Sequence, residues 1–318
     1  MSEYKGPLFQ RVEEVTWNGN FKIGDRKTPL LIKGAVRSWP AWQRWSFEQL
    51  AELKRKDGSD VVVPFTEGLV EQGDTPELPL RPVGPYLREL ARQAQEPVSD
   101  DVGLMPLRRL REIRPQDWFH LQWDYMQSFT PNRLYLTMWD ILRDFPQMKR
   151  DFAISELWPG WRWRWEYVFM GPSRTVTGWH ADVPNNLFCQ VRGTKEVLLV
   201  PPEYNASMCV SKKYDLGAVV SNVNVAKLNV PSPERDKFAQ VRGIYARVEA
   251  GDVLFIPGYT WHAVVAMEPS ISLAVFGLTP WEMLVHGTYP GILELLHQMR
   301  LYRWGDCTCH KSRNVGRG

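Results

Sequence analysis

From about residue 164 onward, the chain consists of short apolar or alternating runs separated by Gly, Pro and Asn. Successive side chains of a strand point to opposite faces, so short runs of this kind indicate half-buried or fully buried strands. The runs are WEYVFMG, FCQVRG, KEVLLVPP, YARVEAGDVLFIPG, HAVVAM and SISLAVFGL. Short strands with turn residues between them predict an all-β barrel or sandwich.

The first half of the chain mixes helix and strand patterns. Residues 28–56 predict a short apolar strand, a turn and a helix that begins at Ser46, with Gln49 three residues later as in a capping box. Residues 59–66 predict another strand. The runs YLRELARQAQ, RLYLTMWD and DILRDFPQMKRDF then predict a helix, a strand and a short helix that ends before Pro146.

The length of 318 residues and this order of patterns predict one main domain with helical additions. We expect N-terminal αβ elements that pack on the core in residues 1–130, and the β core itself in residues 131–281. A C-terminal helix, with the pattern ILELLHQMRLYRW, and a flexible tail are expected in residues 282–318.

Composition and charge exclude several classes of protein. The 39 Lys and Arg against 36 Asp and Glu give a net charge of +3, below that of a dedicated nucleic-acid binder. No apolar run approaches the roughly 18 residues of a membrane-spanning helix, so no membrane partner is expected. The start MSEYKGPLFQ lacks a signal-peptide pattern, and the four cysteines follow no secreted framework. We therefore expect a cytoplasmic location, or a nuclear one if the source is eukaryotic.

The run GWHAD, residues 178–182, places a histidine and a carboxylate two positions apart in a predicted strand. Such residues share a face, so His180 and Asp182 can reach one ion. A second histidine, His262, lies just past a Pro-Gly turn at the start of another strand. Two histidines and one carboxylate form the facial triad of non-haem Fe(II) and oxygen chemistry. A zinc hydrolase remains an alternative, because zinc uses the same ligand types.

Several motifs in order resemble a known family. His180-x-Asp182, NNLFCQVRGTKEVLLVPP and VEAGDVLFIPGYTWHAV resemble the JmjC and cupin-like Fe(II)- and 2-oxoglutarate-dependent oxygenases. The resemblance is greatest to the JmjC-only hydroxylases, the type that includes the asparaginyl hydroxylase acting on hypoxia-inducible factor. It extends from TPLLIKGAVRSWPAW to VFGLTPW and implies a double-stranded β-helix, a jelly-roll core that is mainly β with flanking helices.

The resemblance also assigns roles to individual residues. It implies that His180, Asp182 and His262 bind Fe(II), with 2-oxoglutarate as cosubstrate and O2 as oxidant. The residues that match those holding the cosubstrate's distal carboxylate are Thr177 and Lys195. Tyr135 matches a tyrosine that also reaches the cosubstrate, and Asn186 matches a polar position beside the iron.

A buried ammonium with a neighbouring hydroxyl suits a desolvated carboxylate, which supports the assignment of Lys195. One departure concerns the strand after His262, where family hydroxylases often carry an asparagine. The run SISLAVFGL offers only small and apolar residues near Val275 to Gly277.

The predicted function is a 2-oxoglutarate-dependent dioxygenase that hydroxylates a side chain in a protein or peptide. Alternatives are a hydroxylase of a modified tRNA base or of a small natural product, an N-methyl demethylase, and a non-catalytic metal-binding cupin module. The tryptophan-rich run WPGWRWRWEY, residues 158–167, either packs in the core or forms one wall of the substrate entrance. The basic patch Arg108, Arg109, Arg111 and Arg114 is either a solvated face or an anionic-substrate surface.

The C-terminal segment carries two further hypotheses. Cys307-x-Cys309-His310 resembles half of a zinc site, but no second ligand pair lies near it in sequence, so we expect a loose reduced tail. Because related hydroxylases often dimerise through C-terminal helices, the resemblance implies a homodimer through the predicted helix.

Overall fold

The computed structural model describes residues 6–67, 77–97, 104, 112–121, 130–215, 218–228 and 230–307, with only the backbone described for 286–290. Three of the four arginines of the predicted basic patch, and both Cys309 and His310, lie outside these residues. Within the described ranges, none of the helices has the length and the apolar character needed to cross a membrane.

In the described part of the chain, most strands belong to two large sheets. The first sheet has the order β13 (Ala218–Val220), β10 (Val176–Asp182), β16 (Trp261–Ala266), β12 (Lys195–Val200), β14 (Arg242–Val248), β1 (Leu8–Arg11) and β7 (Trp118–His120). The second has the order β2 (Glu13–Thr16), β3 (Leu30–Lys33), β15 (Val253–Ile256), β11 (Asn185–Arg192), β17 (Ser270–Leu278), β9 (Trp163–Gly171), β8 (Leu134–Trp139) and β5 (Thr66–Glu67). A small pair is formed by β4 (Val62–Pro64) and β6 (Leu80–Pro82).

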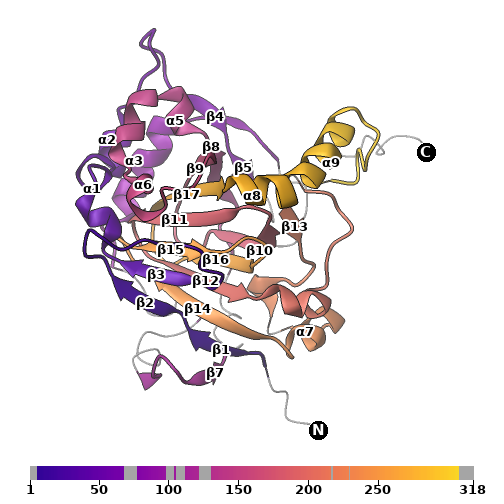
Figure 1. Cartoon of the computed structure of the whole chain (residues 1–318). Helices are drawn as coiled ribbons and strands as arrows, with labels where there is room; N and C mark the ends of the chain where they lie inside the picture. Colours follow the sequence, from indigo (N-terminus) through magenta and orange to yellow (C-terminus); the bar gives the residue numbers. More distant parts are fainter. Residues whose placement is uncertain are drawn as a thin grey trace.

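The two large sheets face each other, and the strands from β9 to β12 and from β14 to β17 alternate between them, as in a double-stranded β-helix (Figure 1). One apolar cluster fills the space between the sheets, and two others cover their outer faces. The central strands β12 and β16 are buried at every position because both of their faces are covered. The predicted jelly-roll core is confirmed.

Short helices surround the sheets. They are α1 (Ala41–Arg44), α2 (Phe47–Ala51), α3 (Val83–Gln93), α5 (Ile141–Asp144), α6 (Ile154–Leu157), α7 (Pro233–Phe238), α8 (Pro280–Glu282), α9 (Thr288–Gln298), the 3-10 turns η1 (Ala35–Ser38), η4 (Pro146–Asp151), η5 (Pro202–Met208) and η6 (Val225–Lys227), and the π turn η7 (Met283–Gly287). Helices α1, α2, α3, α5 and α6 lie against the outer face of the sheet that contains β11 and β17 (Figure 1). The predicted capping box at the start of α2 is present, with Ser46 and Gln49 bonded in both directions.

The C-terminal helix differs from its predicted extent. It ends at Gln298, although the apolar pattern continues to Trp304. Arg300 adopts a left-handed conformation with φ of 63°, and the amides of Arg300 and Leu301 bond to the carbonyls of His297 and Leu296. This arrangement is a Schellman motif, which closes a helix even when the apolar pattern continues beyond it.

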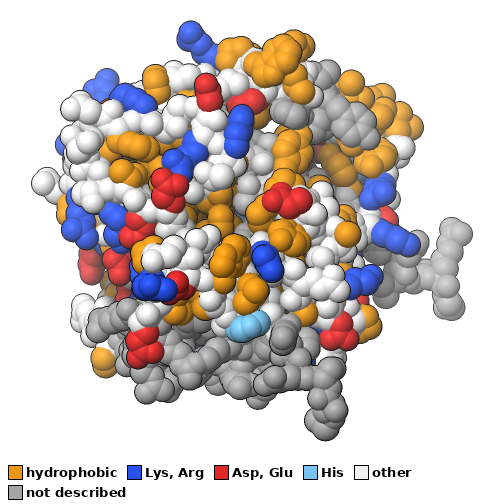
Figure 2. All heavy atoms as spheres, turned by 60° about the horizontal axis from the view of Figure 1, so that its bottom comes forward, with side chains coloured by type: hydrophobic (Ala, Val, Ile, Leu, Met, Phe, Trp, Pro, Cys, Tyr) orange, Lys and Arg blue, Asp and Glu red, His pale blue; other side chains and the backbone are white. Residues whose placement is uncertain are grey.

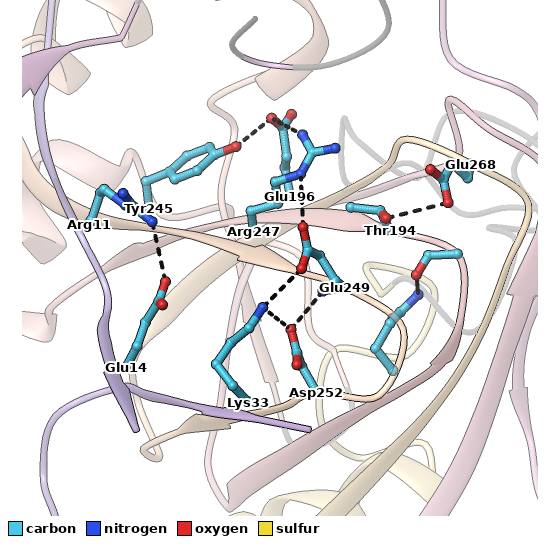
Figure 3. Close-up of polar contacts among 12 residues, drawn as sticks. Arg11, Glu14, Lys33, Thr194, Glu196, Tyr245, Arg247, Glu249, Asp252 and Glu268 are labelled. Atoms are coloured by element: carbon cyan, nitrogen blue, oxygen red, sulfur yellow. Dashed lines mark hydrogen bonds and ion pairs between the residues drawn. The ribbon is translucent and has the colours of Figure 1, made fainter. Parts of the chain in front are cut away.

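The N-terminal residues contribute strands to both large sheets. Strand β1 pairs with β14, and β3 pairs with β15. A polar cluster fastens β3 to the turn between β14 and β15, because Lys33 Nζ lies 2.6 Å from Asp252 and 3.1 Å from Glu249 (Figure 3). The buried Asp252 also accepts a hydrogen bond from the Gly34 amide at 3.0 Å. These contacts hold β3 in place beside β15 in the second sheet.

Candidate metal centre

Neighbouring strands bring the two histidines and the carboxylate together. In the antiparallel pairing of β10 with β16, His180 lies directly opposite His262. Asp182 follows two residues after His180 and shares its face of the sheet. Nε2 of His262 lies 3.5 Å from Oδ2 of Asp182, and Nε2 of His180 lies 3.8 Å from it. The ligand atoms all lie within 4.8 Å of one another, so one ion can contact all three.

Both imidazole rings are oriented by the same local device. Nδ1 of His180 donates to the carbonyl of Gly178 at 2.8 Å, and Nδ1 of His262 donates to the carbonyl of Thr260 at 2.9 Å. A carbonyl oxygen only accepts, so Nδ1 carries the proton in each ring. The lone pair of Nε2 then faces Asp182 in both cases. Such backbone contacts fix the tautomer of metal-binding histidines.

A bulge in β10 brings Thr177 onto the same face as the histidine. The pairing runs from Thr177 opposite Val264 to His180 opposite His262, so β10 has one more residue than β16 in this interval. In a regular strand, residues three apart point to opposite faces. The extra residue reverses this alternation, and both Thr177 and His180 line the same cavity.

The electrostatics of the three groups fit a divalent cation. Oδ2 of Asp182 is buried and has no hydrogen-bond partner among the described residues. Burial raises the pKa of Asp182 to about 6, while His180 acts to lower it and Asp215 to raise it. Burial, and secondarily the neighbouring His180, lowers the pKa of His262 well below its usual value, so this ring is neutral, as a ligand must be. A cation at this position would compensate the buried carboxylate.

The triad opens into a cavity of about 250 Å³ between the two sheets. Its walls combine the triad with residues from β8, β9, β11, β17 and the segment around β13. The lining residues are Tyr135, Thr137, Met138, Phe169, Thr177, Gly178, Trp179, His180, Asp182, Asn186, Phe188, Asp215, Ala218, Val220, Ser221, Ile256, His262, Val264, Ala274 and Phe276. This volume suits a small organic acid next to the metal.

Lys195 lies beside two residues of the cavity wall, Tyr135 and Phe188, with little compensation for its charge. It is 1% exposed, and its Nζ donates to the hydroxyl of Tyr135 at 3.0 Å. The same nitrogen lies over the rings of Tyr135 and Phe188 at 5.5 and 5.3 Å from their centroids. Among the described residues, no carboxylate forms an ion pair with it, and burial lowers its pKa to about 7. An added carboxylate would supply the missing partner.

The tyrosine beside Lys195 is held in a tight position. Burial raises the pKa of Tyr135, and the Thr177 hydroxyl partly offsets this increase. The ring lies over Gly171 of β9, where an added Cβ would come within 2.6 Å of the Tyr135 Cδ2 atom. Lys195, Tyr135 and Thr177 therefore form a connected polar group.

The remaining predicted residue, Asn186, lies on β11 and lines the cavity. It is 4% exposed, and its Oδ1 has no hydrogen-bond partner among the described residues. The strand after His262 offers Ala274 and Phe276 to the cavity, so this wall is apolar, as expected from SISLAVFGL. Sequence reasoning missed Asp215, which lies in the wall although no motif marks it. Asp215 comes close to the triad because β13, which follows it, pairs with β10.

A double-stranded β-helix with two histidines and one carboxylate at the mouth of its interior is the arrangement of a metal-binding cupin. The profile of the Cupin-like domain family matches residues 21–276, and the chain belongs to this family. The broader resemblance to JmjC cupins is confirmed, whereas the narrower one to the asparaginyl hydroxylase type stays a prediction.

Curated relatives differ in what their names describe. The tRNA wybutosine-synthesizing protein 5 of Gallus gallus is 30% identical over 176 residues, which cover 54% of this chain and 52% of that protein. JmjC domain-containing protein E of Dictyostelium discoideum is 22% identical over 315 residues, covering 86% and 83%. Lysine-specific demethylase JMJ21 of Arabidopsis thaliana is 23% identical over 267 residues, covering 78% and 23%. The chain thus spans about half of the first relative and a smaller share of the third.

Proposed function

We propose that the protein is an Fe(II)- and 2-oxoglutarate-dependent oxygenase. The observation that carries this proposal is the buried Lys195, which has no carboxylate partner among the described residues and contacts Tyr135 and Phe188, two residues that line the cavity of the triad. A metal site alone does not require a buried ammonium, and its burial is costly without a partner. A dicarboxylate in the cavity would bind the metal with one carboxylate and pair with Lys195, beside Tyr135, with the other.

Each residue of the proposed site then has a distinct role. His180 and His262 would present Nε2 to Fe(II), and Asp182 would present Oδ2. The ammonium of Lys195 and the hydroxyls of Tyr135 and Thr177 would bind the distal carboxylate of 2-oxoglutarate.

Bound iron would supply oxygen activation coupled to decarboxylation of the cosubstrate. The apolar side chains of Phe169, Phe188 and Phe276 line the cavity and would limit the access of water to these groups. A dry site strengthens the ionic contacts at both ends of the cosubstrate.

The substrate that the proposal favours is a side chain of a protein or peptide. On the face shown in Figure 2, basic and acidic side chains of the described residues are interspersed, without a large basic surface. A long nucleic-acid footprint would need such a surface. The similarity to a tRNA wybutosine-synthesizing protein supports a modified tRNA base as the second candidate. N-methyl demethylation is the same chemistry on a methyl group beside nitrogen, and the name of the demethylase relative keeps it as a third candidate.

Succinate formation tests the enzyme class without knowledge of the substrate. Purified protein loaded with Fe(II) is incubated with labelled 2-oxoglutarate, ascorbate and oxygen, and labelled succinate is quantified. We expect slow uncoupled turnover in the wild type and in Trp281→Ser, whose ring is 71% exposed and lies outside the cavity lining. We expect none in His180→Ala. Failure of the Mn(II)-loaded wild type to bind 2-oxoglutarate would refute the proposal and favour the zinc hydrolase or the non-catalytic cupin module.

A further inference from the structure

A row of aromatic side chains leads out of the cavity along β9. Phe169, Tyr167, Trp165 and Trp163 occupy alternate positions and therefore share one face of the strand. Phe169 lines the cavity. Phe276 of β17 also lines it, and this residue stands opposite Trp165 in the pairing of β17 with β9. The shared face is thus the one turned toward the space between the sheets, and the row continues the cavity wall outward.

The two tryptophans at the outer end of the row are exposed, whereas the other tryptophans of the run 158–167 are buried. Trp163 and Trp165 are 42% and 40% exposed. Trp158 and Trp161 are buried, stack with ring centroids 4.8 Å apart, and belong to the cluster beneath the helices. The tryptophan-rich run therefore divides into a core pair and an exposed pair. Indole rings are enriched where one surface is covered by a partner.

A strained residue stands where the row meets the cavity. Met138 has φ of 54°, is 53% exposed and lies within a bulge of β8 between Leu136 and Trp139. The left-handed region is unfavourable for a residue with a Cβ atom, so Met138 is held in a strained conformation. Met138 lines both the cavity and an adjoining surface groove, and Tyr167 lines that groove as well. The bulge thus aims a flexible apolar side chain at the entrance.

The charges beside the row favour a polypeptide over a nucleic acid. Arg164 lies 2.6 Å from Glu166. Arg143 lies 3.7 and 3.9 Å from Asp140 and Asp144, and it lines the groove. The described lining of the cavity includes carboxylates but no lysine or arginine. A phosphate backbone draws its affinity from several cations, and two of the arginines beside the row, Arg143 and Arg164, are already paired with carboxylates.

We propose that Trp163, Trp165, Tyr167 and Met138 form the binding site for an extended segment of a protein substrate. Apolar or aromatic side chains of that segment pack on the indole rings, while a neighbouring residue enters the cavity. The six residue steps from Trp163 to Phe169 span roughly 20 Å, the length of about six residues of extended peptide. Arg162, which is exposed at the outer end, can pair with an acidic residue of the segment. This inference rests on the proposed function and specifies its substrate class.

Selection from a random-peptide phage library tests the row. The full chain is immobilised with Mn(II) and 2-oxoglutarate, selected peptides are synthesised, and their Kd values are measured. For Trp163→Ser/Trp165→Ser we expect binding weaker by at least about tenfold, since two packed aromatic rings are lost. Trp163→Phe/Trp165→Phe should recover most of the affinity. Trp281→Ser, a surface tryptophan outside the row, should bind like the wild type.

Two outcomes would overturn the row as a peptide site: selection of no peptide above the uncoated surface, or peptides whose Kd is equal for the wild type and the serine variant. Total tRNA offered to the same surfaces gives a third outcome. Its capture with the same tryptophan dependence and without peptide capture would reassign the row to nucleic acid. The Kd of the wild type for 2-oxoglutarate is measured separately. Peptide capture without 2-oxoglutarate binding would refute the proposed function, while 2-oxoglutarate binding without peptide capture would refute only the row.

Discussion

Lys195 and Tyr135 join the two sheets inside the barrel, with Nζ of the lysine 3.0 Å from the hydroxyl of the tyrosine. Lys195 begins β12 of one sheet, and Tyr135 lies on β8 of the other. A hydrogen bond across the interior fixes the distance between the ammonium and the triad more firmly than a flexible lysine on one sheet could. The proposed cosubstrate site is therefore built by both sheets.

Replacement of Lys195 by methionine should separate cosubstrate binding from metal binding. A bound carboxylate would be left desolvated and unpaired, which weakens 2-oxoglutarate binding by about 10²-fold or more. Mn(II) affinity should stay near that of the wild type, because the triad is intact. Isothermal titration calorimetry measures both constants, and Lys149→Met, a change at an exposed lysine, is the matched control. Unchanged 2-oxoglutarate affinity in Lys195→Met would show that the role carried over to this residue is wrong.

The lowered pKa of Lys195 predicts a pH-dependent affinity for 2-oxoglutarate. Burial lowers this pKa to about 7, and a bound carboxylate favours the charged form. Above pH 7 the protein must take up a proton to bind, so Kd should rise by up to about tenfold per pH unit. Titrations of Mn(II)-loaded protein check this. Lys195→Arg keeps its charge at these pH values, and any binding that it retains should lack the dependence.

The same pKa has a consequence for stability without ligand. The folded-state pKa lies below the usual value of 10.5, so between pH 7 and 10.5 the unfolded chain binds more protons at this site. The contribution of Lys195 to the free energy of unfolding should therefore increase as the pH rises through this window. Urea denaturation of the wild type and Lys195→Met at several pH values measures it. A difference between the two proteins that is constant with pH would contradict the lowered pKa.

Gly171→Ala should disturb the proposed cosubstrate site by displacing the ring of Tyr135. The added Cβ would lie 2.6 Å from Cδ2 of Tyr135 and 2.9 Å from Cγ2 of Thr175, so the ring must move. We expect a loss of about 1–3 kcal/mol in the free energy of unfolding, together with weaker 2-oxoglutarate binding. Gly291→Ala, at a helical position with open space around it, should be neutral or slightly stabilising. Thermal denaturation and calorimetry distinguish the two variants.

Strand patterns and turn residues predicted the β core, because apolar runs this short, separated by Gly, Pro and Asn, are typical of strands. The triad was also accessible from sequence, since two ligands lie two positions apart on a strand and the third follows a Pro-Gly turn. Three features were not accessible. The bulge between Thr177 and His180 depends on the register with β16, the end of α9 on an arginine in the left-handed region, and the place of Asp215 on a long-range pairing.

The tryptophan-rich run shows the same limit within one segment. The spacing of its tryptophans did not decide between a core segment and a wall of the substrate entrance. In the structure the rings differ, since Trp161 is buried and Trp163 is exposed. Trp161 packs directly over the backbone of Gly277, a contact that only the pairing of β9 with β17 creates. Tertiary contacts thus decided which of the rings remained exposed.

The homodimer remains a prediction, and the C-terminal helix offers a surface for it. Ile292, Leu295 and Met299 share one face of the helical segment and are 52%, 61% and 57% exposed. Helix α9 extends away from the sheets at the upper right of Figure 1. We expect Leu295→Glu to yield a monomer where the wild type is a dimer, as measured by light scattering after size-exclusion chromatography. A wild type that is monomeric at all accessible concentrations would exclude this contact.

Asp182→Asn should remove metal binding while the fold is retained. The substitution keeps the shape of the side chain but removes the charge that faces Nε2 of both His180 and His262. An amide oxygen is a weaker ligand for Fe(II) than a carboxylate, so affinity for Fe(II) or Mn(II) should fall by an order of magnitude or more. The free energy of unfolding of the metal-free protein should stay the same or increase, because a buried carboxylate without a hydrogen bond to Oδ2 is costly. Electron paramagnetic resonance of Mn(II) and thermal denaturation measure the two effects. Asp215→Asn, which alters the cavity wall but no proposed ligand, is the control, and equal metal affinity in Asp182→Asn and the wild type would remove Asp182 from the metal centre.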